Sequence, residues 1–542
     1  MFRFNTCLEL LLGCWVSKAS DIAKTSTRGS FHYLWGLVLS TAISAVGTIF
    51  IARLLGSDQY GLYTIVLAAP SLIVTFRDWG INSAMIKFTA QYRAEERNAE
   101  IRSIFLTGVL FEVILGIVLS LISFAFAGFL ATSLYNRPII APLIEIASFS
   151  ILAGALITAA TAAFTGFEKM EQNSIMLVFH SIFKTVLIVA LVLLGFGASG
   201  ATTGFVISTF IGGLIGLALV WKLYADLPKF SGYALQIKVY LTTMLTYALP
   251  LSFAAILSSL LPHFYSFLLP IHYSTDNTMI GSYGIANNFV VLISFFALPI
   301  TTMVFPAFSK LHPINDKDTL GSVFQFSVKY ASLFVVPMTT LVMCLAVPAV
   351  STLFGGTYSA APLFLALLAF QYLFTTFGSL SIGGLLSGQG NTSFILKMAI
   401  LTICIGIPVG YVGIIYFGVL GLIVTSLIAG LPSLIWGLIF VRKTYGVSVD
   451  WLSSAKILVA SSIAASVTFG AISIFSFSSL VELVLGTAIF MIVLVPSVLL
   501  VRSISRNDIA NLRGMVEGLG TVGRLFIGVL GVLEKIMDVF NL

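Results

Sequence analysis

The sequence predicts an all-α, polytopic membrane protein with about 14 transmembrane helices. Of its 542 residues, 58% are hydrophobic and only 9% are charged, whereas soluble domains carry roughly 25% charged residues. Apolar stretches of about 20 residues, long enough to cross the hydrocarbon core of a bilayer, recur along the chain. Lys and Arg collect in alternate connections between these stretches, as the positive-inside rule requires.

The apolar stretches define the predicted spans in chain order, because Gly, Pro, Asn and charged residues separate them. The fourteen spans lie near residues 31–55, 60–86, 103–131, 139–164, 174–195, 201–224, 240–269, 279–308, 325–354, 360–387, 394–416, 418–441, 455–477 and 481–503. The N-terminal stretch CLELLLGCWV is too short to span a membrane and has no clear cleavage site after it, so we expect an interfacial segment rather than a signal peptide.

The basic residues give an independent test of this topology. In the predicted arrangement, 22 of the 28 Lys and Arg residues lie on one side of the membrane. The others are Arg53 and Arg137 in the opposite connections and, in spans or at their ends, Arg77, Lys87, Lys184 and Lys329. An error of one span would destroy this alternation. We therefore expect a multi-pass protein of the cell (cytoplasmic) membrane with both termini in the cytoplasm and short outside loops.

Charge and cysteine usage argue against two classes of protein. The net charge is +7, but the basic residues are spread over short loops instead of one polar domain, so we expect no nucleic-acid partner. The four cysteines, Cys7, Cys14, Cys344 and Cys404, lack metal-ligand spacing. We therefore expect no disulfide framework, no metal site and no cofactor.

The two halves of the chain resemble each other at an offset of about 220 residues. The matching segments are GLY at 61–63 and GSY at 281–283, TGFEKMEQN at 165–173 and SGQGNTSF at 387–394, and GFGASGATTG at 195–204 and YFGVLGLIVT at 416–425. An even number of spans separates equivalent points, which predicts two six-helix lobes in the same orientation. Parallel repeats of this kind place a binding site at the lobe interface near the middle of the membrane.

The repeat sets the expected domain organisation. It comprises an interfacial N-terminal segment at 1–30, a six-helix lobe at 31–230, a second six-helix lobe at 231–445, transmembrane helices 13 and 14 at 446–504, and a cytoplasmic amphipathic segment at 505–542.

Arg77 and Asp78 are the first candidate substrate-binding residues, because charges inside a span are costly and usually face a cavity or a partner. They lie roughly 25 Å along span 2 from its outside end. Asp78 shares a helical face with Ser71 and Asn82. A wall that attracts phosphate and sugar hydroxyls is one interpretation. A structural role is the other, in which each charge has its own partner, since adjacent residues on a helix do not face each other.

His180 and Lys184 lie four residues apart in span 5 and form the second candidate site. A lysine this far into an apolar span could bind a diphosphate in a low-dielectric cleft. The alternative is a lysine that extends to the cytoplasmic interface.

Span 7 supplies the candidate His263, which continues a polar stripe of serines on a helix interrupted by prolines. Such serines also bind neighbouring helices together without a transport role. Arg53 and Lys329 are weaker candidates for residues beside the cavity, since anchoring at the membrane interface explains them equally well. Glu112 and Glu145 are possible cation or proton sites, but packing between helices explains them better.

Several motifs together identify a family. These are IARLLGSDQYGLYT at 51–64, DWGINSAMIKFTAQY at 78–92, GSYGIANN at 281–288 and TGFEKMEQNS at 165–174. With a count near fourteen spans, their order resembles the polysaccharide flippases of the Wzx type, in the multidrug/oligosaccharidyl-lipid/polysaccharide exporter superfamily. The likeness covers roughly residues 30–500. It implies a V-shaped bundle of two six-helix lobes around a central cavity, which moves lipid-linked sugars to the outer leaflet by alternating access.

The resemblance predicts a transporter, not an enzyme, that flips a lipid-linked oligosaccharide used in polysaccharide biosynthesis. Its expected partners are membrane lipid and the lipid-linked glycan, with possible H+ or Na+ coupling, and we expect a monomer. The alternative within the superfamily is a drug/cation antiporter, a branch that typically has twelve spans. A membrane glycosyltransferase or polymerase is the alternative from another class, but it would need a large outside loop that this sequence lacks.

Overall fold

The computed structural model describes residues 2–77, 79–228, 236–273, 275–313, 315–474, 477–506, 508–510, 513, 531 and 534. Within its helices it describes the side chains of residues 33, 35–249, 252–253, 255–294, 296 and 308 onward. Most of the predicted amphipathic segment 505–542 lies outside the described residues.

The described secondary structure is entirely helical, which confirms the predicted fold class. In chain order the elements are α1 (Phe2–Val74), α2 (Ile81–Ala94), α3 (Asn98–Phe129), η1 (Leu130–Leu134), η2 (Pro138–Ile140), α4 (Ala141–Gly166), α5 (Met170–Leu191), η3 (Val192–Phe196), α6 (Gly197–Ala225), α7 (Ile237–His272), α8 (Asn277–Lys310), α9 (Lys317–Cys344), α10 (Ala346–Phe354), α11 (Ala361–Phe370), η4 (Gln371–Phe377), α12 (Ser379–Gly388), α13 (Thr392–Tyr445), α14 (Trp451–Ile474) and α15 (Ser479–Leu500). No strand occurs among these residues.

Nine of the described helical stretches are long and apolar enough to cross a membrane, or ten if the bent pair Ala361–Phe377 and Ser379–Gly388 is one span. Two of these stretches each contain two predicted spans, and a third contains most of span 1 with the first part of span 2; in all three the spans are joined at glycines with positive φ. The three glycines are Gly56 in α1, Gly195 between α5 and α6, and Gly418 in α13. Only glycine adopts such backbone angles without strain, so it marks these turns. The count of fourteen stays a prediction.

The chain forms two compact units. The first contains residues 1–54 and 66–256, and the second contains residues 55–65 and 257–542. Helix α7 therefore contributes to both units, and a short piece of α1 packs with the second.

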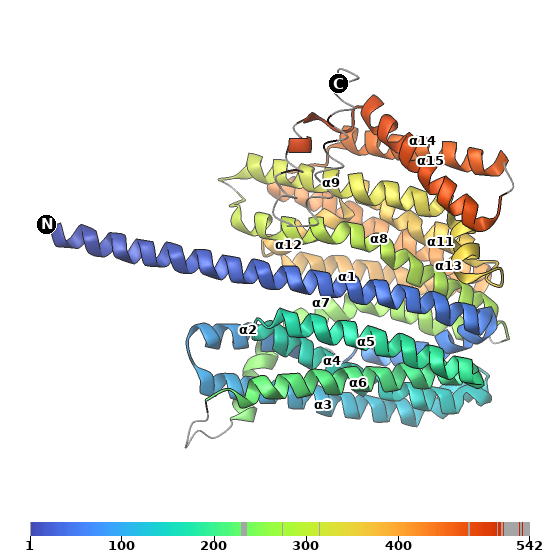
Figure 1. Cartoon of the computed structure of the whole chain (residues 1–542), viewed down its shortest axis with the longest axis horizontal. Coiled ribbons are helices and arrows are strands. Elements are labelled where there is room, and N and C mark those ends of the chain that lie inside the picture. Colours follow the sequence, from blue (N-terminus) through green and yellow to red (C-terminus); the bar gives the residue numbers. More distant parts are fainter. Residues whose placement is uncertain are drawn as a thin grey trace. The chain divides into compact units, whose positions relative to one another are not determined.

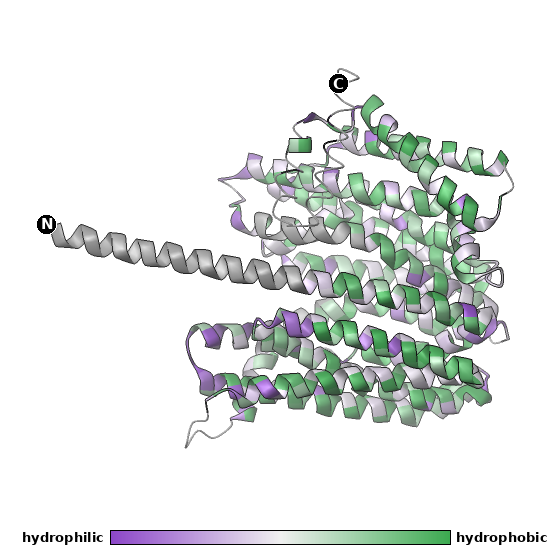
Figure 2. Ribbon diagram, in the orientation of Figure 1, coloured by the Kyte–Doolittle hydropathy of each residue, from purple (hydrophilic) through white to green (hydrophobic). Residues whose placement is uncertain are grey.

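In the first unit α3, α4, α5 and α6 lie side by side (Figure 1). Figure 2 shows that these helices are mostly hydrophobic, with hydrophilic residues around the connection from α2 to α3. The buried side chains of one core cluster in this unit come from α2, α3, α4, α5, α6 and α7. This core fixes the helices that carry the candidate residues of the first unit.

The backbone confirms the internal repeat that the sequence predicts. Gly197 (φ 52°, ψ −135°) and Gly418 (φ 60°, ψ −138°) occupy equivalent positions and share an unusual conformation. Glu168 and Gly390 are also equivalent, and both have a positive φ just after a helix. In both places the next backbone N–H donates to a carbonyl five residues earlier, which completes a Schellman motif.

One helix differs between the two copies. Helix α4 is continuous over 26 residues, whereas its counterpart begins with the same Ala-Pro-Leu at Ala361 and ends at Gly388, two residues later than the repeat requires. This longer counterpart is not a continuous α-helix. It contains the 3-10 segment η4, and it bends by 53° at Gly378, which has a φ of 83°. The predicted span 360–387 is therefore a broken helix.

Two further predicted spans are also interrupted. Span 2 was expected to be continuous from 60 to 86, but α1 ends at Val74 and α2 begins at Ile81. Span 9, expected at 325–354, consists of α9 and α10. Broken helices at membrane depth occur where other parts of the protein or a cavity satisfy the freed backbone groups.

Candidate functional site

The break between α1 and α2 positions Arg77. Its side chain is only 8% exposed, and its Nη1 donates to the carbonyl oxygen of Ile151 on α4 at 3.2 Å. Gly154, one turn further along α4, leaves the space that the guanidinium occupies. Arg77 therefore binds the backbone of the first unit. Its predicted neighbour Asp78 lies outside the described residues.

The contact between Arg77 and α4 gives a testable prediction. A Cβ at Gly154 would lie 2.7 Å from Arg77 Nη1, so Gly154→Ala should displace the guanidinium from the Ile151 carbonyl. Loss of a hydrogen bond to a charged group costs roughly 1.5–3 kcal/mol. We expect a lower unfolding temperature of the purified protein, measured by a thermal-shift assay. Gly128→Ala on α3 is the matched control, because no atom lies within 4 Å of its Cβ position. Equal unfolding temperatures for the two variants would contradict the prediction.

Asn82 lies in the first turn of α2 and contacts a buried carboxyl group. Its Nδ2 donates to Oε1 of Glu112 on α3 at 3.0 Å. Glu112 is fully buried and Asn82 is half-buried. The pair joins α2 to α3 directly after the helix break. Glu112 is thus a packing partner of a candidate residue, in agreement with the structural interpretation of its sequence position.

Helix α5 presents two different faces in the first unit. One face carries Ser174, Ser181 and Thr185, which pack closely on small residues of α1. Close approach of small residues is a common way to join helices in membranes.

The other face of α5 carries His180 and, one turn later, Lys184. The His180 ring contacts α6 at Gly212, where a Cβ would lie 2.9 Å from His180 Cδ2. Lys184 is half-buried, and among the described residues it makes no hydrogen bond or ion pair. A lysine in an apolar span without a protein partner is costly unless water or a ligand binds it. The structure therefore leaves Lys184 as a candidate for an anion contact.

A groove of about 690 Å³ runs along α7 in the first unit. The described residues that line it are Lys238, Val239, Thr242, Thr243, Thr246 and Tyr247, and none of these is acidic. Each threonine hydroxyl donates to the carbonyl oxygen four residues earlier in α7. The hydroxyl oxygens can therefore still accept hydrogen bonds from a ligand.

Lys87 of α2 lies beside the same groove. Its ammonium group is 3.8 Å from the centroid of the Tyr247 ring and 5.0 Å from that of Phe88, which is the geometry of a cation–π contact. Sequence reasoning missed this groove. The signal was present, since Lys238, Thr242, Thr243 and Thr246 recur at helical spacing before the serine stripe of the same span.

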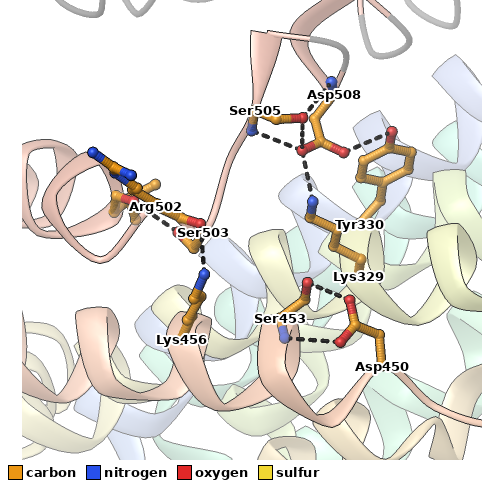
Figure 3. Close-up of polar contacts among 10 residues, drawn as sticks. Lys329, Tyr330, Asp450, Ser453, Lys456, Arg502, Ser503, Ser505 and Asp508 are labelled. Carbon is orange, nitrogen blue, oxygen red and sulfur yellow. Dashed lines mark hydrogen bonds and ion pairs between the residues drawn. The ribbon is translucent and has the colours of Figure 1, made fainter. Parts of the chain in front are cut away.

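The remaining candidates are not among the described residues that line the groove. Arg53 is exposed on α1, and His263 is half-buried in the part of α7 that belongs to the second unit. The Lys329 ammonium binds Asp508, which follows α15, at 2.6 Å (Figure 3). Within the described part of the chain, no group of three or more His, Cys, Asp or Glu side chains could hold a metal ion.

These features define a class, the all-α multi-pass membrane proteins with an internal helical repeat. The chain belongs to the polysaccharide biosynthesis protein family, whose model matches residues 26–312. An uncharacterized membrane protein of Methanocaldococcus jannaschii is 22% identical over 433 residues, which cover 77% of this chain and 84% of that protein. A probable low-salt glycan biosynthesis flippase of Haloferax volcanii is 20% identical over 264 residues. That match covers 48% of this chain and 56% of the relative.

Solved structures show the same fold. The lipid II flippase MurJ in an inward closed conformation matches with a TM-score of 0.67 and 16% identity, over 87% of this chain and 98% of that one. An inward-facing multidrug resistance MATE family transporter of the MOP superfamily matches with a TM-score of 0.58 and 17% identity, over 75% and 95% of the two chains. These likenesses confirm the resemblance to the exporter superfamily at the level of the fold.

Proposed function

We propose that this protein moves a lipid-linked oligosaccharide, a precursor of a polysaccharide, across the cell membrane by alternating access. The observation that carries the proposal is the groove on α7, with Lys238 in its lining and Lys87 beside it. Two ammonium groups attract the phosphate that joins a glycan to its lipid. Threonine hydroxyls and a tyrosine ring suit the hydroxyl groups and the apolar face of a sugar.

Family membership and the curated relatives support the proposal. One relative is described as a glycan biosynthesis flippase, although the chain spans only about half of its length. A flippase needs no covalent chemistry, because the head group only has to bind differently in two conformations. This agrees with the expectation that the protein is not an enzyme.

The second candidate function is drug or cation antiport, and the buried Glu112 with its Asn82 partner favours it. A cationic substrate would need acidic groups where it binds. The α7 groove instead has basic residues, so we prefer the anionic, lipid-linked substrate.

The direct test removes the gene and measures lipid-linked sugars by mass spectrometry. Under the proposal, a lipid-linked oligosaccharide accumulates, and the wild-type gene reverses this. Accumulation of no lipid-linked sugar, together with greater sensitivity to cationic drugs, would favour antiport and contradict the proposal.

The basic residues of the groove can be tested in the same assay. We expect the double variant Lys87→Gln, Lys238→Gln to restore export poorly, since each charge-assisted hydrogen bond to a phosphate is worth roughly 1.5–3 kcal/mol. That range corresponds to about tenfold or more in binding for each lysine. Lys169→Gln, at the exposed connection from α4 to α5, is the matched control and should restore export fully. Full export by the double variant, at a normal protein level in the membrane, would exclude a substrate contact at these lysines.

The cell-membrane location and the cytoplasmic termini are part of the proposal, and thiol labelling tests them. A single cysteine at Ser199 should react with an impermeant reagent in intact cells, whereas one at Asn98 should react only after lysis. The reason is the excess of Lys and Arg near Asn98, which marks the cytoplasmic side. Labelling at Asn98 from outside would reverse the topology.

A further inference from the structure

The segment that follows α15 is fixed by two backbone motifs. Arg502 has a positive φ of 52°, and Ser503 N–H donates to the carbonyl oxygen of Val498 at 3.0 Å. This Schellman motif ends α15 and turns the chain sharply. The next helical residues begin after Ser505, whose backbone N–H donates to Asp508 Oδ2 at 2.8 Å, while Asp508 N–H donates to Ser505 Oγ at 3.3 Å. The two contacts form a capping box.

The carboxylate of Asp508 also binds α9. Oδ2 accepts a hydrogen bond from Lys329 Nζ at 2.6 Å, and Oδ1 accepts one from the Tyr330 hydroxyl at 3.3 Å (Figure 3). The Asp508 side chain is 3% exposed and that of Lys329 is 17% exposed. One buried carboxylate therefore caps its own helix and holds a basic residue 179 positions earlier in the sequence.

The charge of Asp508 is maintained despite its burial. Burial raises the pKa of the carboxyl group, but the hydrogen bonds from Lys329 and Ser505 outweigh this, so the pKa lies below its ordinary value. The contact is therefore an ion pair at neutral pH. An ion pair removed from water specifies one arrangement of its helices, because either charge alone would be left uncompensated.

Apolar contacts surround this ion pair. Ile504 and Ile509, from the segment after α15, are buried with Tyr330 of α9 and Ala460 of α14. A second cluster joins the far end of α9 to α14 and α15 through Leu341, Leu345, Ala464 and Phe490. The pair α14–α15 is thus attached to α9 at two places. The first includes the ion pair of Lys329 and Asp508, and the second is the apolar cluster at the far end of α9.

We propose that Lys329, Tyr330, Ser505 and Asp508 form a clasp that locks Ile504, Asp508 and Ile509, which follow α15, onto α9, and that releasing it frees these residues while the second unit stays folded. With the clasp closed, α9, α14 and α15 move as one body, and Asp508 is held against α9. Among the described residues, this segment contacts α9 through Asp508, Ile504 and Ile509, so loss of the polar contact can open it locally. This proposal does not depend on the transported substrate.

The test uses the full-length protein with its four native cysteines replaced and one reporter cysteine at Ile509, which is fully buried. Lys329→Met and Asp508→Asn should each raise the rate of maleimide labelling at this reporter by about tenfold or more. The double variant Lys329→Met, Asp508→Asn should raise the labelling rate by less than the product of the two single increases, because both substitutions remove the same contact.

Two controls separate release of the clasp from general unfolding. Asp318→Asn removes an exposed carboxylate from the first turn of α9, and it should leave the labelling rate unchanged. A second reporter cysteine at Leu365, fully buried on α11, should stay protected in every variant. An unchanged rate at Ile509 in both clasp variants would overturn the proposal, as would an equal rise at Leu365.

Discussion

Gly61→Ala and Gly281→Ala are each expected to destabilise the protein and to stop most of its export. The two glycines belong to the equivalent Gly-x-Tyr motifs, and in the second unit the motifs pack against each other. A Cβ at Gly61 would lie 1.9 Å from the carbonyl oxygen of Asn277, and a Cβ at Gly281 would lie 2.4 Å from that of Ser57. Each glycine thus faces the carbonyl four residues before its counterpart.

These clashes cannot be relieved by rotating a side chain, because the opposing atoms belong to the backbone. The helices must separate, which typically costs about 1–3 kcal/mol for an overpacked contact. The unfolding temperature should fall by a few degrees, and the helices could no longer approach as they do in this conformation. Gly321→Ala in the same unit, where no atom lies within 4 Å, should change neither stability nor export. Wild-type stability of both the Gly61 and the Gly281 variant would show that the close contact is absent in the membrane.

Cross-linking cysteines at Asp58 and Asn277 is expected to reduce export by about tenfold or more, since trapping one state of a gate blocks the whole cycle. The Asn277 Nδ2 donates to Asp58 Oδ1 at 2.8 Å, so the two side chains meet directly. Tyr60 and Asn288 add a second hydrogen bond nearby, from Asn288 Nδ2 to the Tyr60 hydroxyl. In the topology we propose, this region lies at the outside ends of the helices, which must part if the substrate is released outside.

The experiment needs a protein without its native cysteines and a measured extent of cross-linking. Export should return when a disulfide is reduced, and either single cysteine should transport normally. Reagents of increasing length should restore activity step by step if the two ends move apart during transport. Full export by completely cross-linked protein, with the shortest effective reagent, would exclude separation at this point.

Sequence reasoning recognised these motifs as a repeat but gave no reason for their glycines. Similarity at an offset of about 220 residues shows that two segments are equivalent, not that they touch. In the structure the backbone approach at Gly61 and Gly281 supplies the reason, since any side chain there would collide with a carbonyl oxygen. The all-α class and the repeat were predictable because hydropathy and turn glycines are local signals.

The candidate site was only partly predictable. A charged side chain within a span costs free energy and must therefore have a binding partner, but the sequence does not show which group that partner is. Arg77 and Lys329 look alike in sequence, yet one binds a backbone carbonyl of α4 and the other binds Asp508. Such partners are far away in the chain and follow no periodic pattern. The α7 groove was missed although its threonines recur at helical spacing, because the sequence does not show that Lys87 of α2 lies beside them.

The bend at Gly378 accompanies a difference in helix length between the two halves of the chain. This difference indicates how the two halves diverged. A straight helix such as α4 and a bent one such as α11–η4–α12 differ by two residues between the same fixed ends. An insertion or deletion of two residues separates the two forms. The two duplicated halves could therefore diverge in shape in one genetic event. The number of residues between the Ala-Pro-Leu and the final glycine in a relative should reveal whether that helix is straight or bent.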